Sequence, residues 1–399
     1  MKKIVAVALC SLTVCSISAQ KVNVEAAKKM AGKIDKVEEA RNIINEAKSN
    51  PETANDPLTY SVAGDIEFKA FDKANLKRST NPNDKDVNPL NMAEQLVNGY
   101  NDMIKVIELD TQDPKAKLAK DAIKKINSHY ADYYDGALTF YQEKKYYPEA
   151  YNAFLIYGTL PMKDFADKGV KATPDSISNQ SLFNAGVCAY SGNALKEAAE
   201  AFKLARLNNT DNDQCYIYEI ACWQNIAQRD STMENAAKAE IDAIAEAGYR
   251  KFGINPPVFF NNLVNSMVMN EKMDDALALI NNQLSATPDN ANLYGLLGYV
   301  NDRKGDDNAS EANYRKAADM PDVDAETLKN VSKKLYKLGT AKYNALDRND
   351  GAGKAAVKSD YFEAAKKYAE KAKQISPETT SDMDYVIENI DYALSTYFN

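Results

Sequence analysis

The chain contains little of what most catalytic sites require. Its 399 residues include a single histidine, His129, and a single tryptophan, Trp223. A metal site built from several imidazoles and the histidine–carboxylate pairs of many hydrolases are therefore largely excluded. His129 lies in a predicted helix, and we interpret it as a surface or packing residue, because a lone histidine carries little information about a site.

Long apolar runs are also missing. The stretch Ile4 to Val14 has 11 residues, whereas a membrane-spanning helix needs about 20. It follows Lys2 and Lys3 and precedes the small residues at 16–19, so we predict that residues 1–19 form a secretory signal peptide. No later stretch is continuously apolar over that length. We therefore expect an exported protein, periplasmic or associated with the outer envelope, without a transmembrane segment.

Positive charge is in deficit. The 49 Lys and Arg residues face 57 Asp and Glu residues, which gives a formal net charge of -8. There is no long basic run that would neutralise phosphates. Nucleic acid is therefore not an expected partner.

Cysteines are too few for a disulfide framework. Only Cys188, Cys215 and Cys222 follow the predicted signal peptide, an odd number for an exported protein. We interpret Cys188 and Cys222 as small apolar packing residues. Lipidation is not expected at Cys15, because Val14 stands where lipid-attachment sites usually have Gly, Ala or Ser.

What the chain does contain is an internal repeat. Between residues 256 and 322 one pattern occurs twice, 34 residues apart, so that Phe260 corresponds to Tyr294 and Ile280 to Tyr314. A fixed period of this length is typical of stacked helix pairs. Such a chain buries its core between neighbouring units and offers an extended surface, which favours binding over catalysis.

The unit resembles the tetratricopeptide repeat, which has a large residue at position 4, Leu-Gly at 7 and 8, Ala at 20, an aromatic at 24 and Pro near 32. Residues 257–290 supply Phe260, Leu263, Ala276, Ile280 and Pro288. The resemblance implies an all-α fold, a right-handed solenoid of about eight helix pairs. The strongest repeats span 179–212, 213–255, 257–290 and 291–324, degenerate repeats span 20–56, 57–113, 114–162 and 332–378, and a capping helix spans 382–398.

Residue size along the repeats predicts how the helices pack. Small residues such as Gly186 and Gly298 are expected where the two helices of a unit approach closely, and large ones such as Phe202 fill the space between them. Two stretches break the period, Ala74 to Pro89 and Lys163 to Ser178. We predict a loop for the first, and for the second a long connection or one short helix.

Motifs for phosphate or calcium binding fail on their spacing. Gly351 to Ala355 lacks both the first glycine of a phosphate-binding loop and the Ser or Thr after its lysine. Asp347 to Gly351 places the glycine fifth rather than sixth from the first Asp of a calcium loop. We interpret this segment as a flexible turn and expect no metal or cofactor.

In tetratricopeptide proteins the concave surface is lined by positions 2, 5, 9, 12 and 13 of each first helix. Transferring these positions gives a neutral, amide-rich and aromatic groove. Its candidate partner-binding residues are Gln180, Phe183, Val187, Tyr190, Gln214, Ile217, Gln224, Asn225, Asn261, Asn265, Met269, Asn292, Tyr299, Asp302, Tyr336 and Tyr343. The Lys and Asn pair with which some family members bind acidic chaperone tails is absent.

Amide groups can bond an extended peptide backbone while aromatic rings cover its side chains, which suits a polypeptide segment. Alternatively, much of this face packs against the long connections or against the superhelix itself.

We therefore expect a non-enzymatic protein-binding scaffold or assembly factor of the bacterial cell envelope. The alternative is a carbohydrate-binding envelope protein related to the tetratricopeptide glycan-capture lipoproteins. Those are generally longer and lipidated, and sugar sites usually display several stacking aromatics, whereas Trp223 is the only tryptophan here. An enzyme whose repeats only position a catalytic segment is disfavoured, because no segment is large enough to hold such a site.

Overall fold

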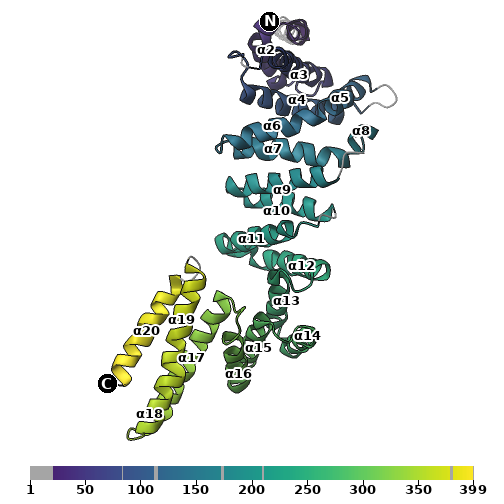
Figure 1. Cartoon of the computed structure of the whole chain (residues 1–399). Coiled ribbons are helices and arrows are strands. Elements are labelled where there is room, and N and C mark those ends of the chain that lie inside the picture. Colours follow the sequence, from purple (N-terminus) through teal and green to yellow (C-terminus); the bar gives the residue numbers. More distant parts are fainter. Residues whose placement is uncertain are drawn as a thin grey trace, which may run out of the picture. The chain divides into compact units, whose positions relative to one another are not determined.

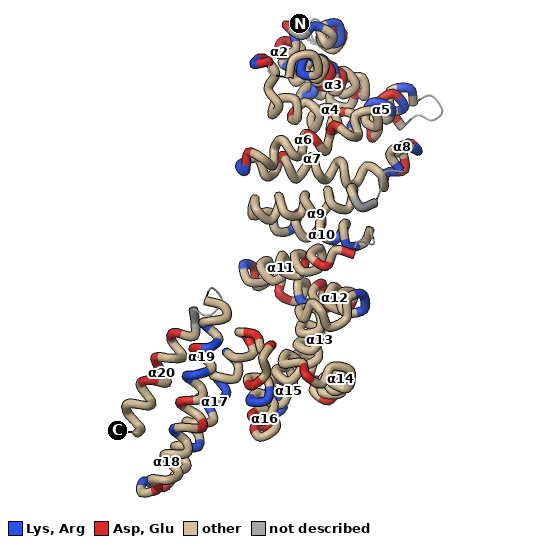
Figure 2. Tube along the Cα trace, in the orientation of Figure 1, with Lys and Arg blue, Asp and Glu red and all other residues tan. Residues whose placement is uncertain are grey.

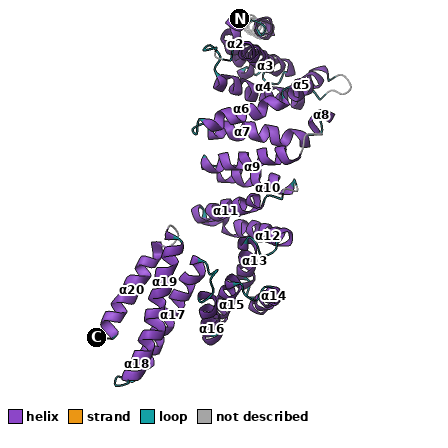
Figure 3. Cartoon of the chain, in the orientation of Figure 1, coloured by secondary structure: helices purple, strands orange, loops and turns teal. Residues whose placement is uncertain are grey.

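The computed structural model describes residues 21–82, 84–111, 116–171, 175–208, 211–377 and 381–398. All regular structure in these ranges is helical, with no strand (Figures 1 and 3). No helix within them combines the length and the apolar character needed to cross a membrane. The predicted signal peptide, including Cys15, lies outside the described residues.

The chain divides into two compact units, with the boundary after Glu240. In the first unit, residues 21–30 form a helix. The following elements are η1 (Ile34–Lys36), α2 (Val37–Ser49), α3 (Pro57–Thr80), α4 (Pro89–Leu109), α5 (Lys117–Ser128), α6 (Tyr130–Gln142), α7 (Tyr147–Thr159), η2 (Leu160–Met162), α8 (Lys168–Lys171), α9 (Asp175–Ser191), α10 (Leu195–Leu207), α11 (Asp213–Arg229) and η3 (Ser231–Met233). The pairs α3 with α4, α6 with α7 and α9 with α10 pack side by side, as Figure 1 shows for the last two.

Helix α12 (Glu234–Phe252) spans the boundary, and eight α-helices follow in the described part of the second unit. They are α13 (Pro257–Met269), α14 (Met273–Ala286), α15 (Ala291–Lys304), α16 (Asp307–Ala318), α17 (Ala325–Ala345), α18 (Gly351–Val357), α19 (Ala364–Ile375) and α20 (Ser381–Tyr397). A π-helical segment, η4 (Lys358–Glu363), joins α18 to α19. Helix α20 packs on α19 and is the C-terminal capping helix.

Helix starts follow from local sequence. Asp56 and Asn88 each precede a proline, and their side-chain oxygens accept hydrogen bonds from the backbone N–H groups of Leu58 and Leu90 at 2.9 Å. The capping oxygen satisfies an N–H that has no partner inside the helix, and proline in the first turn loses no hydrogen bond there. These two caps fix where α3 and α4 begin.

The predicted close approach of small and large residues is confirmed in two repeats. A Cβ atom added to Gly186 on α9 would lie 2.5 Å from the ring of Phe202 on α10, and one added to Gly298 on α15 would lie 2.5 Å from the ring of Tyr314 on α16. Both rings are buried. The absent side chain therefore sets the distance between the two helices of each pair.

Two segments that we expected to be irregular are partly helical. Helix α3 continues to Thr80, so the loop expected from Ala74 to Pro89 is confined to the stretch between α3 and α4. Here Lys77, in the last turn of α3, forms an ion pair with Asp86 at 3.1 Å and so ties the loop to the helix end. The flexible turn predicted from Asp347 onward is confined to residues 347–350, and for Gly351 to Ala355 the prediction was wrong. These residues begin α18, because the Asp350 carboxylate caps it by accepting from the Gly353 N–H at 2.7 Å.

The second interruption, Lys163 to Ser178, contains the short helix α8 and the start of α9. Residues 172–174 lie outside the described ranges. Of the two forms expected for this stretch, the structure has the one with a short helix.

Candidate functional site

Aromatic side chains gather where α9 meets α11 in the first unit. The Phe183 and Tyr190 rings on α9 both contact the Tyr218 ring on α11 edge-on, with centroid distances of 5.9 and 6.1 Å. Tyr218 also stacks on the buried Phe202 ring at 5.4 Å, and 37 % of its surface remains exposed. The cluster is thus anchored in the core by Phe202 and open to solvent at Tyr218.

Tyr218 was not among the predicted groove residues. It occupies position 6 of its repeat, which is outside the positions transferred from the tetratricopeptide pattern. Its neighbour Ile217, which was predicted, is half-buried on α11. The only sequence signal that marks Tyr218 is a large apolar ring next to a groove position.

The other predicted residues of the first unit lie on the same two helices, α9 and α11, and most of them are amides. Gln180, Gln214 and Gln224 are exposed, whereas Val187 and Asn225 are half-buried. The amides that form hydrogen bonds do so locally: Gln180 donates to Asn184 at 2.9 Å and Gln214 to Asp213 at 3.2 Å. Local partners on the same helix leave these groups free to exchange for a ligand without disturbing the packing between repeats.

In the second unit the predicted amides bond to one another. Asn261 on α13 and Asn292 on α15 exchange two hydrogen bonds, at 3.4 and 2.9 Å. The Tyr299 hydroxyl on α15 donates to the Asn265 carbonyl on α13 at 2.8 Å. These contacts join successive first helices, so a ligand would have to break them. Met269, at the end of α13, is exposed.

Asp302 is held in an ion pair rather than directed at a partner. The buried Lys334 on α17 places its Nζ 2.5 Å from a carboxylate oxygen of Asp302 and 2.5 Å from one of Asp307. Because a buried ammonium needs counter-charges, this triad secures α17 against the preceding helix pair.

The two predicted tyrosines of α17 are covered by the chain itself. Tyr343 stacks on Tyr397 with a centroid distance of 4.5 Å, and its hydroxyl donates to the Tyr397 carbonyl at 2.9 Å. Tyr336 contacts Phe362 edge-on at 5.8 Å. For these two tyrosines the alternative expectation holds that the face packs against the chain's own elements, here η4 for Tyr336 and the end of α20 for Tyr343.

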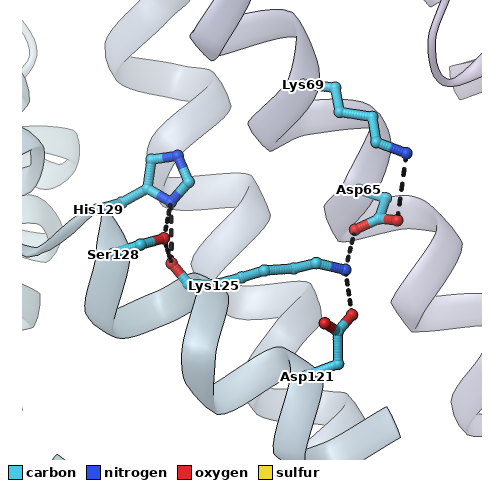
Figure 4. Close-up of polar contacts among 6 residues, drawn as sticks. All are labelled: Asp65, Lys69, Asp121, Lys125, Ser128 and His129. Atoms are coloured by element: carbon cyan, nitrogen blue, oxygen red, sulfur yellow. Dashed lines mark hydrogen bonds and ion pairs between the residues drawn. The ribbon is translucent and has the colours of Figure 1, made fainter. Parts of the chain in front are cut away.

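His129 was predicted to be a surface or a packing residue, and it is a buried packing residue. Its ring stacks on Phe68 at a centroid distance of 4.3 Å. Its Nδ1 lies 2.9 Å from the Lys125 carbonyl and its Nε2 lies 3.2 Å from Asp72. Figure 4 shows the ring beside Ser128, while the Lys125 ammonium extends away from it to Asp65 and Asp121.

The three described cysteines are free thiols in the core. Burial raises the pKa of each to about 12, so the thiols remain protonated and unreactive near neutral pH. The interpretation of Cys188 and Cys222 as packing residues is confirmed.

Comparison with known proteins gives likeness at the level of structure only. No protein-family model matches the chain, and no curated protein matches it. A TPR repeats protein from Bacteroides fragilis is 18 % identical with a TM-score of 0.28, covering 68 % of this chain and 98 % of that one. The TPR domain of P58(IPK) is 12 % identical with a TM-score of 0.27, covering 96 % and 99 %.

The Cut9–Hcn1 hetero-tetramer of APC/C is 12 % identical with a TM-score of 0.34, covering 95 % of this chain and 74 % of that one. The fold class rests on the chain's own helix pairs and on the glycine–aromatic contacts between them. The described chain has an all-α fold of tetratricopeptide-like helix pairs.

Proposed function

We propose that this chain is a non-enzymatic scaffold or assembly factor that binds a polypeptide segment on the face formed by α9 and α11. The observation that carries the proposal is the cluster of Phe183, Tyr190 and Tyr218, which is exposed at Tyr218 and whose helices α9 and α11 also carry exposed amides. Aromatic anchors in such a setting are where binding energy concentrates in protein interfaces. The amides supply donors and acceptors for a peptide backbone.

The first unit supports this role better than the second. The predicted groove amides on α9 and α11 that form hydrogen bonds have only local partners. In the second unit Asn261, Asn292 and Asn265 already join neighbouring helices. A partner on α9 and α11 would gain aromatic contact area without first breaking contacts between repeats. We place the protein in the cell envelope on the strength of the predicted signal peptide at residues 1–19.

The test places a photo-crosslinking amino acid at Tyr218 in the protein expressed in its native cells. A matched control carries the same group at Leu207, which is exposed at the end of α10 in the same unit. We expect a defined protein adduct at position 218 and not at position 207. The adduct partner is then purified and titrated against the unlabelled protein and against a variant with Phe183→Ala and Tyr218→Ala.

An interfacial aromatic side chain contributes about 2 kcal/mol or more when it is a binding hot spot, so the double variant should bind at least about thirtyfold more weakly. Equal adduct yields at the two positions, or unchanged affinity of a double variant that keeps its helicity, would refute the proposal.

A further inference from the structure

The middle of the face formed by α9 and α11 has no unpaired charge. From Ile177 to Ser191, α9 contains no charged residue, and Figure 2 shows this stretch without Lys, Arg, Asp or Glu. On α11, Glu219 is buried and pairs with Arg206 of α10 at 2.6 Å. The other charged residues of α11, Asp213 and Arg229, are its first and last residues. Charged residues are depleted and aromatic residues enriched in the cores of protein interfaces, which is the composition found here.

The aromatic rings on this face have a regular spacing. Phe183 and Tyr190 are seven residues apart on α9, so they lie on the same side of the helix, about 10 Å apart along its axis. The Tyr218 ring of α11 contacts both of them edge-on and therefore lies between them. Phe183 and Tyr190 are half-buried, and 37 % of the surface of Tyr218 is exposed. A ligand on this face thus meets three accessible rings in a row.

This spacing matches one extended conformation of a peptide. A polyproline II helix has three residues per turn and rises about 3.1 Å per residue, so every third side chain points the same way, about 9 Å from the last. In a β-strand the side chains alternate, so those on one side are about 7 or 13 Å apart. The described chain also has no strand to which a β-peptide could add. The spacing therefore favours polyproline II over a β-strand.

An α-helical ligand would repeat the spacing but would not use the polar groups on this face. The hydroxyls of Tyr190 and Tyr218 form no hydrogen bond within the described ranges. The Tyr190 hydroxyl is not buried and Tyr218 is exposed, so a ligand reaches both. Backbone carbonyls of an α-helix are bonded within that helix, whereas those of polyproline II have no internal partner. Unpaired donors beside the rings therefore favour polyproline II.

We propose that the face of α9 and α11 binds a proline-rich segment in the polyproline II conformation, an inference that rests on the proposed function and specifies its ligand. Proline rings pack on the aromatic rings, and the Tyr190 and Tyr218 hydroxyls donate to backbone carbonyls of the segment. Proline has no N–H, so the segment needs few acceptors. The conformation exists before binding, so little entropy is lost on a face that offers only three partly exposed rings.

The first test is calorimetric titration of the full chain with a ten-residue proline peptide, acetylated and amidated so that it carries no charge. The comparison peptides are capped and neutral: a flexible one of alternating Gly and Ser, and a helical one of Ala and Gln. We expect the proline peptide to bind one to one, at least about tenfold more tightly than either comparison peptide. Its affinity should change less than about twofold between about 0.05 and 0.5 M salt, because no charges are paired.

Binding of the proline peptide no tighter than that of the Gly–Ser peptide would overturn the proposal. Tighter binding of the helical peptide would overturn it as well, because the face would then recognise an α-helix. A strong loss of affinity with salt would show that charged groups elsewhere on the chain hold the peptide.

The second test removes only the two hydroxyls. Tyr190→Phe combined with Tyr218→Phe keeps both rings and should weaken binding of the proline peptide about tenfold, since each lost hydrogen bond reduces affinity several-fold. The control is Tyr392→Phe, at an exposed tyrosine of α20 in the other unit, and this variant should bind like the unchanged protein. Undiminished binding by a double variant that keeps its helicity would contradict the site.

The crosslinking experiment separates this inference from the proposed function. A defined protein adduct at position 218, together with no binding of the proline peptide, would refute the polyproline ligand and keep the scaffold role. Binding of the proline peptide, together with equal adduct yields at positions 218 and 207, would refute the scaffold role and keep the ligand chemistry.

Discussion

Gly186→Ala is the substitution whose outcome the structure defines most sharply. A Cβ atom at Gly186 would lie 2.5 to 2.7 Å from three atoms of the Phe202 ring. That ring is fully buried and is held on its other sides by Phe183 and Tyr218. The ring has no room to withdraw, so α9 and α10 must move apart.

Two effects of opposite sign determine how much Gly186→Ala changes the free energy of unfolding. Alanine stabilises a helix interior by about 1 kcal/mol relative to glycine. Overpacking a well-packed core costs about 1 to 3 kcal/mol, and contact with three ring atoms favours the upper end. We expect Gly186→Ala to lower the free energy of unfolding by about 1 to 2 kcal/mol.

The matched control is Gly136→Ala in α6. Here the nearest atoms to an added Cβ belong to Ala93 and Leu96 at 3.5 Å, an ordinary contact distance. Only the helix propensity changes, so the free energy of unfolding of this variant should rise by about 1 kcal/mol. The assay is urea unfolding followed by far-UV circular dichroism, in which a change of 1 to 2 kcal/mol shifts the midpoint by roughly 0.5 to 1 M.

Partial rescue of Gly186→Ala by Phe202→Leu, measured as a double-mutant cycle, would show that the ring is the obstacle. The reasoning is refuted if Gly186→Ala unfolds at the same urea concentration as Gly136→Ala or at a higher one.

Three further predictions test packing and charge. Arg206 Nε lies 2.6 Å from the buried Glu219 carboxylate. Glu219→Gln removes this counter-charge and should lower the free energy of unfolding, measured in urea, by about 3 to 5 kcal/mol. A loss below about 1 kcal/mol would contradict this reasoning. The double substitution Tyr397→Ala and Phe398→Ala removes the rings that contact Tyr343 and Phe362 and should lower the free energy of unfolding by about 2 kcal/mol. The control Tyr392→Ala, at a position that is 69 % exposed, should change it by less than about 0.5 kcal/mol. Equal losses would show that the C-terminal rings do not cover the core. The thiols of Cys188, Cys215 and Cys222 should react with a disulfide reagent at pH 8 far more slowly in the native protein than in denaturant, and equal rates would refute their burial. The free energy of unfolding should also fall as pH rises above about 9, because the thiols of the unfolded chain ionise there while the pKa of each folded thiol is about 12.

Much of the fold could be predicted because its signals are local and periodic. The spacing of Gly186 and Phe202 places a small residue on one helix and a large ring on the next, and the same spacing recurs in Gly298 and Tyr314. Helix packing needs only these residue sizes at these positions. Tyr218 was not predicted, because its ring contacts Phe183 and Tyr190 from position 6, which the repeat pattern does not assign to the concave surface.

By itself, the sequence determined that the chain forms helix pairs and which side chains lie between the two helices of a pair. Only the tertiary structure decided which polar groups remain available. In the structure Asn261 bonds to Asn292, Asp302 pairs with Lys334 and Tyr343 stacks on Tyr397. A polar cleft also lies between α2 and α4. Periodicity specifies the face of a helix on which a residue lies, whereas its partner depends on the offset between neighbouring helices, which loop lengths and core packing set together.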